Sequence, residues 1–553
     1  MKYSGAEITI KLLERQGITT IAGIPGGANL PLYDALARSS IQHILSRHEQ
    51  GAGFIAQGIA RSTGKTAVCF ATSGPGVVNL LTAIADAKLD SVPVVAITGQ
   101  VASTFIGTDA FQEIDTYGMT LPITKHNFLV RTALELLSVI PEAFRIAASG
   151  RPGPVVVDIP KDVQNEQIDI SCWPEPGSSW PFEPIDSEAI MRAAGMINAA
   201  KRPLFYIGGG VIASESSERL RTFIQEKKIP AVSTLNGLGV IADGDPLYLG
   251  MLGMHGSHAT NEIVDSCDLL IALGVRFDDR ATGKISAFAP EAAILHIDID
   301  KTEFNKIKKS DFSINGNIAH VLTMLSDLVI PNSRSNWIET IKTKKSHHNF
   351  ARSRVTDPLH PSSIIRFVGS IAPANAIITT DVGQHQMWVA QSYPFSQPRT
   401  LLTSGGLGTM GFGLPSAIGA ALAHRDRMVI CFSGDGSILM NIQELATVAD
   451  HQLNVKVLLF NNGHLGLVRQ QQELFYKKNY FASKFISSPD FAAIASGFGI
   501  KGFTITSSHD VQSTLAQTLS DNGPAFYNII ISHEYNVLPM VPPGAANSES
   551  IGE

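Results

Sequence analysis

Two oxygen-bearing side chains stand at the ends of consecutive apolar segments of the chain. Asp435, in 434-GDG-436, follows the segment 428-MVICFS-433, and Asn462 ends the segment 455-VKVLLFNN-462. Both segments have the composition of buried strands in a parallel sheet, where the carboxyl ends of neighbouring strands converge on one crevice. Carboxylate and amide oxygens suit Mg²⁺, which completes its coordination with phosphate oxygens. The pattern therefore predicts a magnesium site that binds a phosphorylated ligand.

The glycines on both sides of Asp435 support this interpretation. They allow the backbone to approach a diphosphate closely, and a following helix would direct its N-terminal N–H groups toward it. An Asp-Gly pair alone is common in ordinary turns. The presence of Asn462 after the next strand favours the ligand site over a simple turn.

A second glycine-rich segment, 406-GLGTMG-411, matches G-x-G-x-x-G and precedes the helix-like run 414–423. In a nicotinamide dinucleotide-binding fold, the acid that binds the ribose ends the second strand. The acid of this chain, Asp426, instead precedes the strand at 428–433. We therefore expect no NAD site, and we expect the backbone of this turn to approach another cofactor.

A carboxylate also occupies an unusual position near the start of the chain. Glu49, in 46-SRHEQGAGFIAQG-58, stands between the apolar run 41–45 and a helix-like segment of small residues. Carboxylates are rarely buried at such a junction unless a partner holds them. A favourable charge at a helix N-terminus is the simpler explanation, and these residues alone leave both explanations open.

Short β-rich segments alternate with Ala-rich helical segments along almost the whole chain. Apolar strands of this kind indicate parallel sheets with helices on both faces, so the predicted fold class is α/β. The stretches 172–187 and 331–361 are rich in Pro, Ser and polar residues and are predicted to be linkers. They divide the chain into three doubly wound domains at 1–170, 185–335 and 360–535, with a C-terminal tail or lid at 536–553. The predicted strands include 67–72, 93–99, 204–210, 269–274, 294–300, 428–433 and 455–462.

The first and third domains contain a similar unit. In the first, 69-CFATSGPG-76 is followed by a helix-like run and by the strand 93-PVVAITGQ-100; in the third, 431-CFSGDG-436 is followed in the same way by 455–462. Chance similarity of two strand–turn–helix units is an alternative, but the shared order of elements favours an old duplication.

The composition excludes several classes of protein. The chain has 553 residues, a hydrophobic fraction of 44% and a formal net charge of −6, which is typical of a globular protein and unlike a nucleic-acid binder. It has no apolar run long enough to span a membrane and no signal peptide. The four cysteines are far apart, without a CxxC pair, which indicates reduced thiols in the cytoplasm.

Taken together, GDG, the later NN and the upstream glutamate in a separate α/β domain resemble the signature of enzymes that use thiamine diphosphate (ThDP). Segments along the whole chain are similar to the catalytic (large) subunit of acetohydroxyacid synthase, also called acetolactate synthase, above all to its bacterial isozyme I type. The resemblance implies a pyrimidine-binding first domain, a central FAD-binding domain and a diphosphate-binding third domain. The segments that carry it are 24-IPGG-27, 46–58, 107-GTDAFQE-113, 151-RPGPVVVDIPKDV-163, 251-MLGMHG-256, 274-GVRFDDR-280, 381-DVGQHQMW-388, 403-TSGGLGTMGFGLP-415 and 434-GDGSILMN-441.

The resemblance implies a role for individual residues toward ThDP. Mg²⁺ would be bound by Asp435, Asn462 and the backbone carbonyl of His464. Glu49 of another subunit would exchange a proton with pyrimidine N1′, so that active sites would lie between the subunits of a homodimer or a dimer of dimers. The remaining contacts would come from Gln384, His385, Gly436 and Ser437 at the diphosphate, from Gly408 and Met410 at the aminopyrimidine, with Met410 enforcing a bent cofactor, and from Leu467.

The implied reaction is the decarboxylation of pyruvate and the transfer of the hydroxyethyl unit to pyruvate or 2-ketobutyrate, the first common step of branched-chain amino acid synthesis. The thiazolium of the cofactor would take up the electrons that decarboxylation releases. Gln112 and the backbone of Gly27 would polarise the intermediates. The substrate entrance would be lined by Lys161, Phe111 and Arg280, with Val468 and Gln471 in the channel.

The central domain alone shows only glycine turns, such as 207-IGGG-210, that any doubly wound domain contains. The resemblance implies that it binds FAD, which in this family is structural and takes no part in redox turnover. The implied flavin contacts are Arg151, Gly209, Thr234, Leu235, Leu252, Gly253, Met254, His255, Gly274, Val275, Arg276, Phe277, Asp278, Asp298 and Ile299.

Two related activities remain as alternatives. A ThDP- and FAD-dependent pyruvate oxidase has a similar architecture, but 107-GTDAFQE-113 with 274-GVRFDDR-280 favours the synthase. Glyoxylate carboligase lacks the glutamate that Glu49 supplies here. Family members usually bind a small ACT-domain regulatory subunit, and this chain contains no ACT-like segment. Gln471 stands where many members have a tryptophan, which predicts weak discrimination between the two acceptors.

Overall fold

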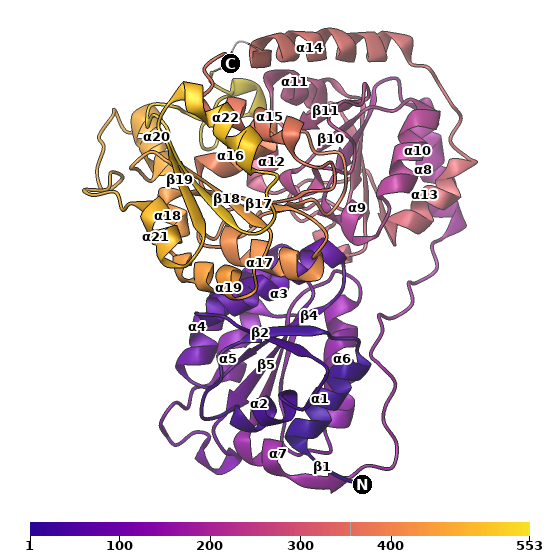
Figure 1. The fold of residues 1–553 in the computed structure, drawn as a ribbon. Helices are drawn as coiled ribbons and strands as arrows, with labels where there is room; N and C mark the ends of the chain where they lie inside the picture. The colour runs from indigo at the N-terminus through magenta and orange to yellow at the C-terminus, as the bar shows by residue number, and fades with distance from the viewer. Residues whose placement is uncertain (354, 553) are drawn as a thin grey trace.

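The computed structural model describes residues 1–353 and 355–552, which form three domains, each around a six-stranded sheet whose strands are all parallel (Figure 1). The first domain lies at the bottom of the figure, the central domain at the right and the third domain at the left. The predicted α/β class is therefore confirmed. Each predicted strand is present, with ends within a few residues of the expected ones.

The first domain orders its strands β3-β2-β4-β5-β7-β6. A short antiparallel pair, β1 (Lys2–Ser4) with β8 (Gln167–Asp169), joins the two ends of this part of the chain. The strands are β2 (Thr20–Gly23), β3 (Gln42–Leu45), β4 (Ala67–Ala71), β5 (Val94–Gln100), β6 (His126–Leu129) and β7 (Val155–Pro160), and the helices are α1 (Gly5–Arg15), α2 (Leu30–Leu36), α3 (Glu49–Thr63), α4 (Pro75–Leu89), α5 (Thr116–Thr120), α6 (Leu136–Ala148) and α7 (Lys161–Asn165).

The central domain has the order β11-β10-β9-β12-β13-β14. Numbered from its own first strand this is 3-2-1-4-5-6, the order of dinucleotide-binding folds, with its switch point between β9 and β12. Its strands are β9 (Pro203–Ile207), β10 (Ala231–Ser233), β11 (Tyr248–Met251), β12 (Leu269–Leu273), β13 (Ala293–Asp298) and β14 (Phe312–Asn315), and its helices are α8 (Ser187–Ala199), α9 (Gly209–Ala213), α10 (Ser217–Lys227), α11 (His258–Ser266), α12 (Asp279–Thr282) and α13 (Ile318–Ser326).

The third domain orders its strands β16-β15-β17-β18-β20-β19. Numbered within each domain, this order and that of the first domain are both 2-1-3-4-6-5, which supports the predicted duplication. The strands are β15 (Ile377–Thr380), β16 (Leu401–Leu402), β17 (Val429–Gly434), β18 (Val455–Asn461), β19 (Lys501–Ile505) and β20 (Ala525–Ile530), and the helices are α15 (Pro361–Ile371), α16 (Gln384–Ser392), α17 (Gly413–Ala423), α18 (Asp435–Ile438), α19 (Leu445–Asp450), α20 (Gly466–Phe475), α21 (Phe491–Gly497) and α22 (Ser508–Thr518).

The prediction of a linker at 331–361 is partly wrong, because most of this stretch forms the helix α14 (Ser335–Ser353). Two of its side chains, Trp337 and Ile341, are buried in the core of the central domain, and the Trp337 indole N–H donates to the carbonyl of Pro203 at 3.1 Å. Residues four apart lie on one face of a helix. These two anchors hold the otherwise polar helix against the domain together with Lys345, whose ammonium donates to the carbonyls of Asp245 at 2.7 Å and Tyr248 at 2.6 Å. The other predicted linker contains no helix or strand between β8 and α8.

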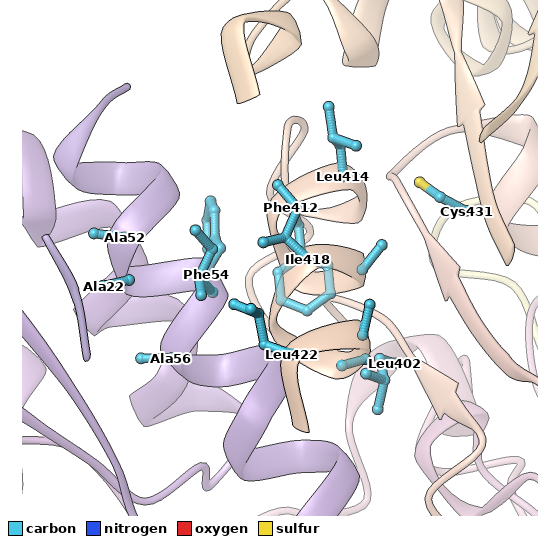
Figure 2. Close-up of a cluster of buried hydrophobic side chains, with 14 of the residues drawn as sticks. Ala22, Ala52, Phe54, Ala56, Leu402, Phe412, Leu414, Ile418, Leu422 and Cys431 are labelled. Carbon is cyan, nitrogen blue, oxygen red and sulfur yellow. The ribbon is translucent and has the colours of Figure 1, made fainter. Parts of the chain in front are cut away.

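A continuous hydrophobic core joins the first and third domains through α3 and α17. Figure 2 shows Phe54 of α3 against Phe412, just before α17, and the two rings meet edge to face at 5.2 Å. The backbones approach closely because glycines stand at the crossing. A Cβ at Gly419 would lie 2.0 Å from the carbonyl oxygen of Ile55, and one at Gly58 would lie 2.2 Å from that of Ser416.

We expect Gly419→Ala to destabilise the protein, because the added methyl group would force the two helices apart. Overpacking of a closely packed site costs about 1–3 kcal/mol. A matched control is Gly195→Ala in α8, where nothing lies within 4 Å of the added atom; replacing this helical glycine should stabilise by about 0.5–1 kcal/mol. Thermal unfolding of both variants measures the difference, and equal melting temperatures would contradict the close crossing.

Candidate active site

Polar residues of the third domain collect at the carboxyl ends of three neighbouring strands, β15, β17 and β18. Gln384 begins the helix after β15, Asp435 begins α18 directly after β17, and Asn462 follows β18. In the order of this sheet, the switch point lies between β15 and β17. The carboxyl edge at a switch point is where open α/β sheets bind their ligands.

Asp435 is buried and lies in contact with the loop that carries Asn462. Its Oδ2 accepts from the backbone N–H of Gly463 at 2.6 Å, and its Oδ1 accepts from that of Gly436 at 3.0 Å. Burial raises the pKa of Asp435 to about 6. A bound cation would offset this effect, because it favours the ionised carboxylate.

The amide of Asn462 links the same loop to Gln384. Its Nδ2 donates to Gln384 Oε1 at 3.3 Å, and its Oδ1 accepts from the backbone N–H of His464 at 3.0 Å. The His464 ring stacks on His533 at 4.7 Å. In the described residues, no three His, Cys, Asp or Glu side chains gather as a metal cluster. A cation here would therefore depend on amide, carbonyl and phosphate oxygens besides one carboxylate, a donor set that suits Mg²⁺.

Two further observations fit a diphosphate at these strand ends. His385 is buried, and its Nε2 has no hydrogen-bond partner among the described residues. Burial lowers the pKa of His385 to about 3, and in the neutral tautomer that is protonated at Nε2 this nitrogen would donate to a phosphate oxygen. A Cβ at Gly436 would lie 2.8 Å from Leu465 and 3.6 Å from Met410 Cε, so the glycine keeps this space open. The Ser437 hydroxyl donates to the carbonyl of Val382 at 2.8 Å.

The Asp381 carboxylate holds the glycine-rich turn at 406–411 through hydrogen bonds. The carboxylate of this fully buried residue accepts from the N–H groups of Gly411 at 2.7 Å and Gly413 at 3.2 Å, and from the Ser433 hydroxyl at 2.8 Å. Gly408 has a φ of 70°, a conformation that favours glycine. Asp426 is exposed between α17 and β17, at the amino end of the strand. The position of this acid agrees with the expectation that the turn is not a dinucleotide motif.

Glu49 is the first residue of α3, is 8% exposed, and its Oε2 accepts from the Asn79 amide at 3.0 Å. The residues on either side of Glu49 position this helix end. The His48 ring caps the helix by accepting from the N–H of Gln50 at 3.1 Å, and Gln50 Oε1 accepts from Asn441 of the third domain at 3.1 Å. In the described part of the chain, no hydrogen bond or ion pair joins Glu49 to Asp435 or Asn462.

A large cavity of about 760 Å³ lies between the three domains. The glycine turns after β9 and β12 face this cavity at the switch point of the central sheet. The two turns touch, because a Cβ at Gly208 would lie 2.1 Å from the carbonyl oxygen of Gly274. Such a cradle lets a ligand approach the backbone. The cavity is lined by every residue of the predicted flavin set except Gly253 and Phe277: Arg151, Gly209, Thr234, Leu235, Leu252, Met254, His255, Gly274, Val275, Arg276, Asp278, Asp298 and Ile299.

The charged residues of this cavity differ in whether they already form ion pairs or hydrogen bonds within the chain. Arg151 forms ion pairs from the first domain to Glu303 at 2.6 Å and Asp300 at 3.4 Å of the central domain. Arg276 is half-buried and makes no hydrogen bond or ion pair with the residues that the structure describes. Burial raises the pKa of Asp298 to about 7. The side chain of Phe277 instead lies in the hydrophobic core, edge to face with Tyr206 at 5.6 Å, so a flavin contact through its ring would need this core to open.

The same cavity extends to some of the predicted ThDP and substrate-channel residues. Gly408, Arg280 on α12, and Leu467 and Gln471 on α20 line it, whereas the exposed Val468 does not. The predicted catalytic residues of the first domain lie outside it. Phe111 is 87% exposed, Gly27 and Lys161 are exposed, and a Cβ at Gly74 would lie 2.8 Å from the Gln112 carbonyl oxygen. Among the described residues, no hydrogen bond, ion pair or shared cavity joins Gly27, Glu49, Phe111, Gln112 and Lys161 of the first domain to the ThDP and channel residues around the second and third domains.

Family models match the chain in three stretches that correspond to these domains. Residues 3–119 match the N-terminal TPP binding domain of thiamine pyrophosphate enzymes, residues 190–325 the central domain, and residues 381–529 the C-terminal TPP binding domain. Fold and site therefore place the chain in the class of thiamine pyrophosphate enzymes.

Known relatives narrow this class. The chain is 53% identical to the acetolactate synthase isozyme 1 large subunit of Escherichia coli (strain K12), with 100% of this chain and 98% of that protein covered. It is 46% identical to the isozyme 2 large subunit of the same organism, with 99% of both covered, and 44% identical to acetolactate synthase 1, chloroplastic, of Nicotiana tabacum, with 99% and 85% covered. The chain belongs to the acetolactate synthase large-subunit family.

Sequence reasoning missed Asp381 and Asn79, which hold the glycine turn and Glu49. Asp381 carried a usable signal, because it follows an apolar strand directly, as Asp435 does. Asn79 carried none, because an asparagine in a helix is usually an ordinary surface residue.

Proposed function

We propose that the chain condenses pyruvate with a second 2-keto acid at sites that form between two copies of the chain. The carrying observation is that no hydrogen bond, ion pair or cavity among the described residues of one copy joins the predicted catalytic residues of the first domain to the predicted ThDP residues of the third. Both groups are flanked by exposed apolar side chains, which mark interaction surfaces when they gather in patches. Those of the first domain are Phe105, Ile106, Phe111, Tyr117 and Leu121, and those of the third are Leu439, Met440, Tyr480, Phe481 and Ile486.

In this homodimer, or dimer of dimers, the third domain of one copy holds ThDP and the first domain of the other supplies Glu49. Asp435, Asn462 and the backbone carbonyl of His464 bind Mg²⁺. Met410 would lie against the bound cofactor, and Glu49 would hold or release a proton at pyrimidine N1′. The other contacts come from Gln384, His385, Gly436 and Ser437 at the diphosphate and from Gly408 and Leu467 at the rings.

The bound cofactor supplies a thiazolium that takes up the electrons released when pyruvate loses CO₂. The residues of the chain bind and orient the two keto acids around it. Arg280 provides a cation for the carboxylate of an incoming acid, with Lys161 and Phe111 of the neighbouring copy at the same entrance. Gln112 and the backbone of Gly27 donate to the oxygen that gains charge.

The products that form from pyruvate with ThDP, Mg²⁺ and FAD test this function, with and without a small subunit. Acetolactate should be the main product. Acetate formed with consumption of an electron acceptor would instead indicate the oxidase.

We place a structural FAD in the cavity between the three domains. Because this flavin takes no part in turnover, its absorbance should stay that of the oxidised form when the holoenzyme is mixed with pyruvate without oxygen. Dithionite serves as the positive control, since it bleaches any bound flavin. Bleaching by pyruvate at the rate of turnover would show that the flavin carries electrons and would favour the oxidase.

We expect the enzyme to discriminate weakly between pyruvate and 2-ketobutyrate as acceptors, because Gln471 lines the cavity at a position where the resemblance to the family implies a tryptophan. A fitted apolar pocket distinguishes one methylene by about 1–3 kcal/mol. Competition of both acceptors in one reaction should give products in proportion to their concentrations within a few-fold. Gln471→Trp should shift the ratio toward the larger acceptor and Gln471→Ala should not; a strong preference in the unaltered enzyme would contradict the assignment.

The relatives are named large subunits, which implies a smaller partner, and we propose a regulatory subunit with ACT domains. Among residues 1–353 and 355–552 we find no helix with the length and apolar content that a bilayer crossing requires. We propose a cytoplasmic location, which the four free cysteines support.

A further inference from the structure

Three charged side chains are buried together where α3 and α4 end. The Arg61 guanidinium donates to Asp86 at 3.2 Å and to Asp90 at 2.9 Å, and the side chains of both acids are fully buried. Arg61 is also held by the Gln57 amide oxygen at 2.8 Å and lies over the Phe412 ring at 5.0 Å. We call Arg61, Asp86 and Asp90 the carboxylate clamp.

The clamp binds a segment of the third domain that the Gln386 amide also holds, where it donates to Thr403 Oγ1 at 2.8 Å and to the Ser404 carbonyl at 3.1 Å. Asp86 Oδ2 accepts from the hydroxyls of Ser404 and Thr409, the latter at 2.9 Å. Asp90 accepts from the N–H of Gly405 at 2.9 Å, and Arg61 donates to the carbonyl of Thr403 at 3.0 Å. The first domain thus holds the segment 403–409 by four contacts.

The held segment contains one proposed cofactor contact, Gly408, and directly precedes another, Met410. Thr409 lies between Gly408 and Met410, and its own N–H donates to the Ser404 hydroxyl at 2.9 Å. The segment contains Gly405, Gly406 and Gly408, and glycine-rich backbone is intrinsically mobile. Its geometry must therefore come from outside contacts.

Stability alone is a poor explanation for the clamp. The site buries two carboxyl groups with one guanidinium, and burial, with a smaller contribution from the neighbouring Asp90, raises the pKa of Asp86. Apolar side chains at such positions are often at least as stable as buried ion pairs. A fully satisfied polar network does, however, fix one geometry of the groups that it contacts.

We propose that Asp86 is a positioning residue of the active site: through Thr409 and Ser404 it fixes the turn that places Gly408 and Met410 against the cofactor. The inference rests on the proposed function for the identity of that cofactor. In this proposal, each end of α3 and α4 has a separate role in the active site. Their N-terminal ends carry Glu49 and Asn79, and their C-terminal ends carry the clamp, about 18 Å away along α3 at 1.5 Å per residue.

Thr409→Val tests the role, because it removes the hydroxyl that Asp86 binds while it conserves the shape of the side chain. The matched control is Thr400→Val, which removes another buried threonine hydroxyl, bonded to the carbonyl of Gln397 at 2.7 Å and outside the turn. Calorimetric titration of ThDP with Mg²⁺ into each cofactor-depleted protein gives the Kd. Melting temperature, flavin content and kcat at saturating ThDP are measured in parallel.

Thr409→Val should raise the Kd of ThDP at least fivefold and lower kcat about tenfold. Its melting temperature and flavin content should equal those of the control variant Thr400→Val. Asp86→Asn should change Kd in the same direction. A Kd and kcat within twofold of the parent, or equal changes in Thr400→Val, would overturn the positioning role. If the parent binds ThDP but forms no acetolactate, the proposed function fails, while a raised Kd in Thr409→Val still supports the role of Asp86.

Discussion

Glu49→Gln is expected to lower kcat at least about a hundredfold, which is the range that a positioned acid–base group contributes. The amide keeps the size of the side chain and can still meet Asn79, but it cannot take up and return a proton at the pyrimidine. Cofactor binding should weaken much less, because the diphosphate contacts lie in the other domain. Initial rates at saturating ThDP, with the Kd measured separately, distinguish the two effects.

Glu444→Gln is the matched control for this substitution. Glu444 is a fully buried glutamate beside the same helix end, where its Oε1 accepts from the N–H groups of Arg47 at 2.8 Å and His48 at 3.1 Å. A glutamine oxygen can accept both bonds, so activity should change only a few-fold. Near-normal activity of Glu49→Gln, or an equal loss in both variants, would refute the role of Glu49 as a proton carrier.

Asp435→Asn is expected to weaken the binding of ThDP with Mg²⁺ by about a hundredfold or more, because it removes the single carboxylate from the proposed cation site. The asparagine oxygen can still accept from Gly463, so the fold of the loop should persist. The rise in melting temperature that saturating ThDP and Mg²⁺ give the parent, which follows from their selective binding to the folded state, should be largely lost.

The control for Asp435→Asn is Asp426→Asn, which neutralises an exposed carboxylate at the opposite end of β17. It should leave both the affinity and the thermal shift unchanged. A Kd of Asp435→Asn close to that of the parent would show that the cation is bound elsewhere. A loss of binding in Asp426→Asn would reopen the dinucleotide interpretation of the turn at 406–411.

The sequence predicted those parts of the molecule in which the residue types at the end of a strand also indicate how neighbouring strands are arranged. Apolar strands that end in Gly or Asp predicted the parallel sheets, and the spacing of Asp435 and Asn462 predicted that two neighbouring strand ends meet. The helix α14 was missed because its composition is polar and its two anchors, Trp337 and Ile341, are apolar only at one-turn spacing. Its helicity depends on packing against the central domain.

The carboxylate clamp could not be derived from the sequence for a different reason. Asp86 and Asp90 lie four residues apart in a helix, which by itself indicates a solvated face. Their partners are Arg61, 25 residues earlier in the chain for Asp86, and the segment 403–409 of another domain. Only the close crossing of α3 and α17 brings these groups together, and that crossing depends on Gly58 and Gly419, whose pairing no local pattern reveals.

The crossing of α3 and α17 has a consequence for how the chain is built. Each of these helices follows the second strand of its domain and precedes the third, so they are equivalent elements of the two repeated sheets. Their contact is reciprocal: Gly58 of α3 faces Ser416 of α17, and Gly419 of α17 faces Ile55 of α3. This is the pattern of an isologous interface. One chain therefore has the internal pseudo-twofold symmetry of a fused dimer, and the specialised halves of its active site, Glu49 on one side and the diphosphate loops on the other, are departures from that symmetry.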